Sequence, residues 1–204
     1  MRGGTVLPAP PSDGERTGLQ TPMGYSLPQK ILHWAVAVLV IGMVPAGIVI
    51  SDFDNKPWVE AYLGPGGFDR LYDLHKNVGV IVLALVAIRL AVRAVQGQPP
   101  YYPPLPVALR IMSRAVHWAL YALLIAAPLI GWIGVSAYPA LPDFFGLGRL
   151  PALTGPDRAL AESLLRLHGV LGIAIGVLAV VHVLAALWHG IIRRDGVLAR
   201  MTWG

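Results

Sequence analysis

Four long apolar stretches constrain the fold of this chain more than any other feature. They cover residues 31–50, 78–95, 115–135 and 170–188. Each approaches or reaches the roughly 20 residues that a helix rising about 1.5 Å per residue needs to cross about 30 Å of hydrocarbon. The sequence therefore predicts an all-α membrane protein, built as a four-transmembrane-helix bundle.

The composition agrees with a chain surrounded by lipid. Only 13% of the 204 residues are charged and 55% are hydrophobic, whereas a water-soluble domain usually carries about 25% charged residues. Residues 1–24 differ, because they are rich in proline, glycine and polar residues and contain no apolar run and no signal-peptide pattern. We interpret them as a disordered N-terminal extension that precedes a membrane domain at residues 25–204.

The charges are sorted between the two ends of the predicted bundle. The N-terminus, the second connection and the C-terminus together hold ten basic and three acidic residues, a net charge of +7. The other two connections hold six basic and eight acidic residues, a net charge of −2. Because lysine and arginine concentrate in cytoplasmic loops, both termini are expected in the cytoplasm. The same sorting explains the net charge of +5 without a nucleic-acid partner, and none is expected.

Cysteine is absent from the sequence. This excludes disulfides, thiolate zinc sites, iron–sulfur clusters and covalent c-type haem attachment. Metal chemistry would depend on histidine, and ionisable side chains within membrane spans mark functional sites by default. All six histidines lie within or at the ends of the apolar stretches, at His33, His75, His117, His168, His182 and His189.

The histidines are expected at two depths. His75 and His168 share one level, next to the two connections that are expected outside the cytoplasm, and we call this level outer. The other level, nearer the cytoplasm, is called inner. His182 follows His168 by 14 residues, nearly four helical turns, so the two share one face of the last helix. A bis-histidine haem needs two imidazoles at equal depth on facing helices. The outer pair is His75 with His168, and the inner pair joins His182 with either His33 or His117.

Other interpretations of these residues remain open. Zinc or copper would need three or four ligands at one point, often with a carboxylate, and the apolar stretches contain no acid. His189 is either an interfacial histidine or a substrate-side group, and Arg89 is expected near a haem propionate or a lipid phosphate. Gly79, Gly172 and Gly176 would leave room for a flat ring or for close helix packing. A haem-free scaffold or transporter is a further alternative.

Several short motifs occur in a fixed order along the sequence, and together they are more specific than any one of them. They are Tyr25-Ser26 with His33-Trp34, Leu74-His75 with Arg89-Leu90 and Arg93, the proline-rich segment 99–106, His117 with Tyr121 and residues 127–131, the histidines of the fourth stretch, and the tail 195–201. With these motifs the chain resembles the bacterial cytochrome b561 family, whose members are four-helix dihaem cytochromes of the inner membrane. The resemblance extends from about Tyr25 to Met201.

The resemblance implies a set of site residues and cofactors. Two haem b groups would be held, the inner one by His33 and His182 and the outer one by His75 and His168, as axial ligands of the haem iron. Contacts to quinone or to a haem propionate are expected from Arg89, Arg114, His117 and His189. The location implied is the bacterial inner membrane, with several spans and with cytoplasmic N- and C-termini. No catalytic residue is assigned.

The resemblance also implies an activity, with an alternative. The expected function is oxidoreductase electron transfer between a periplasmic donor, superoxide being the best candidate, and membrane ubiquinone. The alternative is a cytochrome b subunit that serves a separate dehydrogenase, hydrogenase or soluble cytochrome, docked through the acidic outer loops. Outer loops with a net charge of −2 do not steer an anion broadly. Attraction of superoxide would need a local basic cluster, such as Arg70, Lys76, Arg158 and Arg166.

Overall fold

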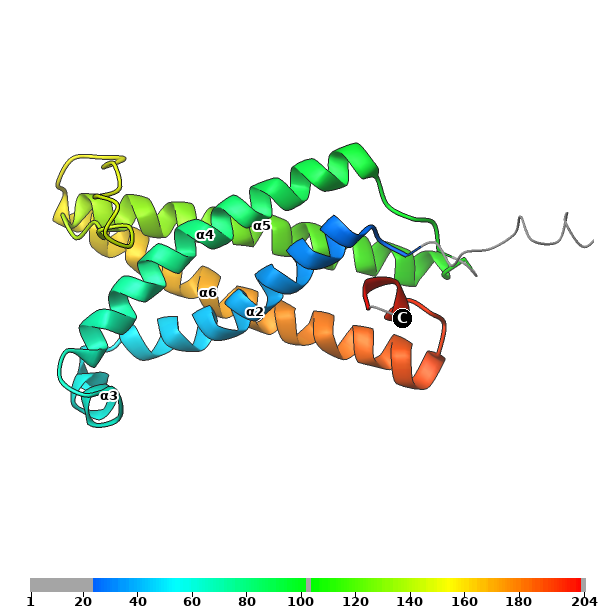
Figure 1. Cartoon of the computed structure of the whole chain (residues 1–204), viewed down its shortest axis with the longest axis horizontal. Helices are drawn as coiled ribbons and strands as arrows, with labels where there is room; N and C mark the ends of the chain where they lie inside the picture. Colours follow the sequence, from blue (N-terminus) through cyan, green and yellow to red (C-terminus); the bar gives the residue numbers. More distant parts are fainter. Residues whose placement is uncertain (1–23, 102–103, 203–204) are drawn as a thin grey trace, which may run out of the picture.

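Four long helices make up most of the described structure, a computed structural model that describes residues 24–101 and 104–202 (Figure 1). Within these ranges no strand is present, and all four helices are long and apolar enough to cross a membrane. The predicted all-α four-helix fold is confirmed. The predicted extension at residues 1–24 lies outside the described residues, apart from Gly24. The long helices are α2 (Leu27–Ile50), α4 (Gly67–Gln96), α5 (Val107–Ala137) and α6 (Arg158–Leu187).

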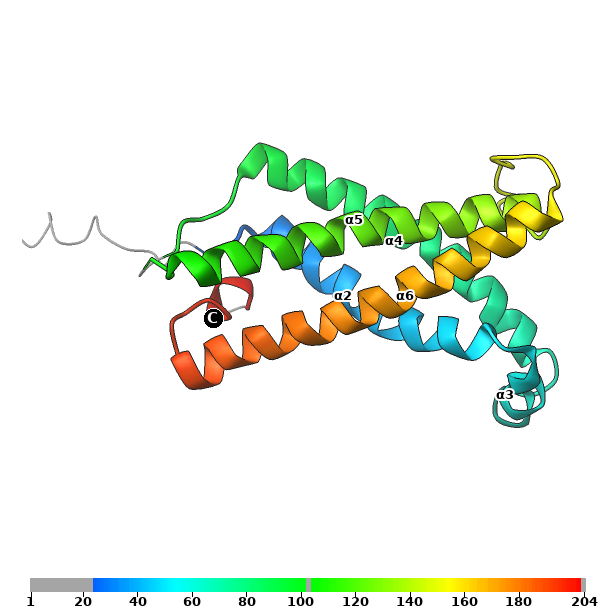
Figure 2. The same ribbon diagram turned by 180° about the vertical axis from the view of Figure 1, so that it is seen from behind.

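The bundle is elongated, with different segments at its two ends. Helix α2 packs mainly on α4, and α5 packs mainly on α6. Figures 1 and 2 show the N-terminal side of α2, the connection from α4 to α5 and the C-terminal tail at one end. We name this the terminal end. The connections that carry residues 51–66 and 138–157 lie at the opposite end, which we name the loop end.

Capping residues explain why the helices extend beyond the apolar stretches. Ser26 precedes α2, and its Oγ accepts a hydrogen bond from the Gln29 N–H at 3.4 Å. Asp157 precedes α6, and its Oδ1 accepts from the Leu160 N–H at 3.0 Å. Such side chains satisfy N–H groups that a helix start leaves unpaired. Pro45 and Pro128 lie inside α2 and α5 without ending either helix, as membrane helices allow.

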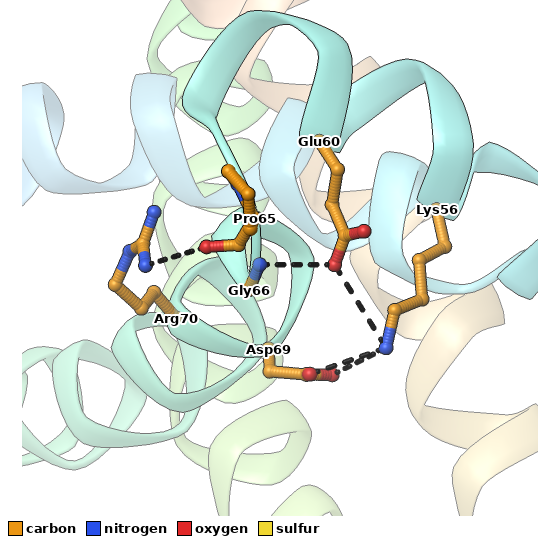
Figure 3. Close-up of polar contacts among 6 residues, drawn as sticks. All are labelled: Lys56, Glu60, Pro65, Gly66, Asp69 and Arg70. Carbon is orange, nitrogen blue, oxygen red and sulfur yellow. Dashed lines mark hydrogen bonds and ion pairs between the residues drawn. The ribbon is translucent and has the colours of Figure 1, made fainter.

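Short helices that the sequence analysis does not predict flank the long ones. The turn η1 (Phe53–Asn55) and helix α3 (Lys56–Leu63) fill the first connection at the loop end. Figure 3 shows how α3 is fixed to the start of α4: Lys56 Nζ lies 3.1 Å from an Asp69 carboxylate oxygen, and the Gly66 N–H donates to Glu60 at 3.2 Å. The π-helical turn η2 (Trp188–Arg193) continues α6, and η3 (Ala199–Met201) lies in the tail.

Apolar side chains cover the outside of the bundle more than its inside. The central cluster of buried residues is small and consists of Val36, Val82, Val86 and Tyr121. Many other apolar side chains point outward; Ile41, for example, is 67% exposed. A contiguous apolar exterior of this kind is costly in water and is the expected surface of a protein embedded in lipid.

The C-terminal tail, residues 194–202, folds back across the terminal end (Figure 1). The Tyr25 N–H donates to the Arg200 carbonyl at 3.1 Å, and Lys30 Nζ donates to the Thr202 carbonyl at 2.7 Å. We call these contacts, with those of the Arg200 side chain, the tail clamp. The Arg200 guanidinium lies 4.4 Å from the ring centre of Tyr101 and donates to the Pro99 carbonyl. The clamp therefore joins both ends of the described chain to the connection between α4 and α5.

Candidate functional site

Two histidines from different helices meet near the loop end. His75 lies on α4 and His168 on α6, and their ring centres are 5.9 Å apart with the ring planes at 90°. The structure thus brings together the two residues that the sequence analysis places at the outer level.

Three histidines meet at a second level nearer the terminal end. His33 on α2 lies with its ring centre 6.0 Å from that of His182 on α6. His117 on α5 lies 5.0 Å from the same ring. Both alternatives for the partner of His182 are therefore within reach, and both come from helices that face α6.

The spacing of two of these pairs suits a shared metal. A metal–imidazole bond is about 2 Å long and the ring centre lies roughly 1 Å beyond the nitrogen, so two rings on opposite sides of one metal have centres about 6 Å apart. The His75–His168 and His33–His182 distances match this value, and the His117–His182 distance falls short of it. Among the described residues, no group of three or more metal-ligating side chains is arranged to hold a bare ion.

Hydrogen bonding of the ring nitrogens gives a second test of fit. Nδ1 of His33 and Nδ1 of His75 are buried without a hydrogen-bond partner among the described residues. Leaving a buried polar atom unpaired costs about 1–3 kcal/mol, and only a group bonded to Nδ1 itself would remove this cost. Nδ1 of His168 donates to the Ala127 carbonyl at 2.8 Å, the usual arrangement of a metal-bound imidazole. His117 donates in the same way to the Ser113 carbonyl at 2.6 Å and remains the alternative partner of His182.

Two glycines that the sequence analysis does not single out make room for the outer pair. A Cβ atom at Gly47 of α2 would lie 2.9 Å from Cε1 of His75, and one at Gly131 of α5 would lie 2.9 Å from Nδ1 of His168. Each glycine thus faces the histidine of the next long helix. Gly172 is expected to leave room for a flat ring or for close helix packing, and among the described residues no atom outside its own stretch of helix lies within 4 Å of the added Cβ. Which glycines face a histidine ring depends on how neighbouring helices are aligned along their axes, and spacing along the sequence does not give this alignment.

Arg89 lies near the terminal end between α4 and α5. Its guanidinium is 5.4 Å from the ring centre of the buried Tyr121, and Arg93 lies over the same ring at 5.7 Å. No ion pair joins Arg89 to a carboxylate among the described residues. A charged side chain held here without a counter-ion suits an anionic group such as a haem propionate.

Arg114 and His117 lie on a cavity of about 380 Å³ at the terminal end. His189 lies elsewhere, in η2, where its Nδ1 is 2.6 Å from Oδ2 of Asp195. Arg193 Nε also lies 3.1 Å from that oxygen. The residues predicted to contact quinone or propionate are therefore divided among three places rather than gathered in one.

Asp195 is the hydrogen-bond partner of His189, a role that its place in the tail motif 195–201 does not indicate. Burial acts to raise the pKa of its carboxyl group. Hydrogen bonds from His189 and from the Val197 N–H, with the positive charge of Arg193, outweigh burial and hold this pKa below its usual range. Asp195 is thus an anion at neutral pH, and it orients the imidazole of His189 through Nδ1.

Helices that cross a membrane and carry facing imidazoles at two levels define a class of protein, the membrane-embedded b-type cytochromes. Residues 24–204 match the profile of the prokaryotic cytochrome b561 family, and the chain belongs to this family. It is thus a membrane electron-transfer protein of a family that carries b-type haem, as the resemblance implied.

Three relatives are similar to this chain over nearly their whole length. Cytochrome b561 homolog 2 of Escherichia coli K12 is 30% identical over 184 residues, which cover 89% of this chain and 92% of the relative. Probable superoxide oxidase CybB of Yersinia pestis is 28% identical, with 87% and 94% covered. Cytochrome b562 of Cereibacter sphaeroides is 28% identical, also with 87% and 94% covered.

Proposed function

We propose that this protein is a dihaem b-type cytochrome that transfers electrons across the bacterial inner membrane, between a periplasmic donor and ubiquinone. The observation that carries the proposal is the pairing of imidazoles on facing helices at two levels, with ring centres 5.9 and 6.0 Å apart. When bound, haem b supplies reversible one-electron chemistry, and the protein supplies position and electrostatic environment.

The chain's own residues would hold the two groups in place. His75 and His168 would hold the outer haem, and His33 and His182 the inner haem. The Ala127 carbonyl fixes the ring of His168 through Nδ1, which sets the direction of Nε2. Arg89, without a carboxylate partner among the described residues, would neutralise a propionate of the inner haem.

A quinone would bind at the terminal end. Arg114 and His117 line the cavity there. Arg114 can donate a hydrogen bond to a quinone oxygen, whereas His117, whose Nδ1–H is bound to the Ser113 carbonyl, offers Nε2 as an acceptor for the hydroxyl of a reduced quinone. His189 offers a second position, because Asp195 holds its Nδ1 and leaves Nε2 for a ligand. The excess of lysine and arginine at the terminal end supports a cytoplasmic location for this end, and therefore for both termini.

Superoxide is the proposed donor at the loop end. The relative from Yersinia pestis, which is named probable superoxide oxidase CybB, supports this choice. Of the four basic residues expected to attract an anion, Lys76 and Arg158 pair with the carboxylates of Asp73 and Glu162. Arg70 donates to the Pro65 carbonyl (Figure 3) and also to the Leu63 carbonyl. Arg70 and Arg166 are both exposed and make no ion pair among the described residues, so these two would contribute most of the local attraction.

An electron-transfer subunit for a separate redox protein is the second candidate. The acidic residues Asp52 and Asp54 favour it, because both are exposed at the loop end and form no ion pair among the described residues. A partner with a basic surface would dock there. Purification from native membranes distinguishes the two functions, since a chain that always runs alone has no such partner.

A spectrum and a quinone assay test the proposed function. The purified chain should show sharp b-type bands in a reduced-minus-oxidised spectrum, contain two haems, and reduce ubiquinone when superoxide is supplied. A chain without b-type bands would be the haem-free scaffold or transporter. Two haems without quinone reduction would remove the superoxide activity and leave the cytochrome.

Histidine variants test the assignment of ligands. His75→Ala and His168→Ala should each lose one haem and retain the inner one, because removing one axial imidazole leaves a buried group with a single ligand. His117→Ala should retain both haems. Haem per chain, measured by extraction and absorbance, is the readout, and loss of a haem in His117→Ala would reverse the proposed pairing at the inner level.

A further inference from the structure

Three arginines line the cavity at the terminal end. Arg93 comes from α4, while Arg110 and Arg114 come from the first turns of α5. The cavity measures about 380 Å³, whereas one water molecule needs about 10–15 Å³. It can therefore hold a ligand much larger than a single water.

The positive charge of this cavity has no internal counter-ion. Among the described residues, no carboxylate lies within ion-pair distance of Arg93, Arg110 or Arg114. Arg110 and Arg114 are also four residues apart on one helix, where like charges repel. An anion bound between the guanidinium groups would remove this repulsion and accept several charge-assisted hydrogen bonds.

The start of α5 adds to the attraction for an anion. Helix α5 begins at Val107 after Pro106, and it has neither a side-chain cap nor an acidic residue in its first turn. The unpaired N–H groups and the helix dipole at such an end favour negative charge. Leu105 and Arg110, on either side of this helix start, both line the cavity.

Apolar side chains beside the arginines indicate a lipid rather than a soluble anion. Val107, Ile111 and Met112 are each at least 60% exposed on the same turns of α5. They can contact acyl chains while the arginines hold a head group. Basic pockets between transmembrane helices on the cytoplasmic side bind anionic head groups in this way.

We propose that the cavity binds an anionic membrane phospholipid, whose phosphate contacts the guanidinium groups of Arg93, Arg110 and Arg114. The Ser113 hydroxyl lies on the same wall and can donate a further hydrogen bond. The proposal does not rest on the redox function. A phospholipid in this cavity would exclude a quinone from the side chains of Arg114 and His117, and the position beside His189 would then be the one left for the quinone. The lipid would seal the side of the bundle between α4 and α5 at the terminal end.

Lipid retention by the haem-loaded protein tests this site. The protein is reconstituted in equal parts of phosphatidylglycerol and phosphatidylcholine, extracted in mild detergent, and analysed for bound lipid by native mass spectrometry. Phosphatidylglycerol should be retained in preference. The Arg93→Gln/Arg110→Gln variant should bind it about fivefold more weakly per arginine removed, and Arg149→Gln, an exposed position at the loop end, should behave as the wild type.

Other results would overturn the proposal. Equal retention of the two lipids by the wild type would show that the cavity does not select negative charge. Thermal stabilisation by inorganic phosphate in phosphatidylcholine alone, equal to that by phosphatidylglycerol, would make it a soluble-anion site. Loss of bound haem in the double variant would assign the arginines to the propionates. If the double variant fails to fold, the exposed Arg110→Gln alone carries the test, with Arg110→Lys expected to restore lipid retention.

Discussion

At the scale of single residues, two glycines leave the space that the imidazoles of the outer pair occupy. A Cβ atom added at Gly47 or at Gly131 would lie 2.9 Å from the nearest atom of a histidine ring. Both positions have helical backbone, so alanine is excluded only by the ring and not by backbone conformation. The steric effect of one methyl group can therefore be measured alone.

Gly47→Ala is expected to displace the ring of His75, because the new Cβ would lie 2.9 Å from Cε1. Such overpacking costs about 1–3 kcal/mol, and the haem-loaded protein should lose its outer haem more readily during thermal unfolding. The matched control is Gly42→Ala on the same helix, where no atom lies within 4 Å of the added Cβ. Equal haem retention by both variants would show that the ring moves freely.

The residue types of the site are predictable from the sequence, and their contacts are not. Spacing along the chain places His75 and His168 at one level, because depth in a membrane helix follows directly from residue number. The proximity of both His33 and His117 to His182 depends on how far each helix is rotated about its axis. Hydropathy does not report this rotation when lipid surrounds a helix that is apolar on every side.

At the scale of elements, the carboxylate of Asp195 joins the tail to η2, the turn that continues α6. Asp195 accepts from His189 and Arg193 of η2 and, through its other oxygen, from the Val197 N–H. Its pKa is lowered in the folded state, so its stabilising effect is present above its ordinary value of 3.8 and is lost as the pH falls below that value through the folded pKa.

Asp195→Asn should loosen the tail by about 1 kcal/mol at neutral pH, since charge-assisted hydrogen bonds to a largely inaccessible carboxylate are replaced by weaker neutral ones. The readout is hydrogen exchange of residues 195–202, corrected for its intrinsic pH dependence. In the wild type, protection should fall as the pH drops below about 3.8, whereas the variant should show no such step. The exposed Asp54→Asn serves as the control, and unchanged protection in Asp195→Asn would contradict this role.

The long helices are more predictable than the segments that join them. Each apolar stretch reports the part of a helix that crosses hydrocarbon, whereas Ser26 and Asp157 begin α2 and α6 before the apolar residues start. Helix α3 is short and mixes Trp58 and Tyr62 with charged residues, so it gives no stretch of the length that identifies a span. The turn η2 continues α6 through Trp188 and His189, where hydropathy alone suggests an end.

At the scale of the whole molecule, the concentration of basic residues at the terminal end predicts that this end of the bundle faces the cytoplasm. Because the sequence contains no cysteine, a single introduced thiol can be labelled without background. Leu147→Cys lies at the loop end, where the native side chain is 83% exposed, and it should react with a membrane-impermeant reagent applied from the periplasm. Ala199→Cys, exposed in the tail, should react only after the membrane is permeabilised, because lysine and arginine concentrate on the cytoplasmic side. The reverse pattern would place both termini outside.

The tail clamp also has a consequence for biogenesis. It joins Tyr25 and Lys30, at the start of the first long helix, to Arg200 and Thr202, which follow the fourth. A nascent chain can therefore close the clamp only when all four helices have been inserted. A chain that ends before residue 200 leaves the Lys30 ammonium and the Tyr25 N–H without these acceptors, so its terminal end lacks the hydrogen bonds that hold the first helix to the tail.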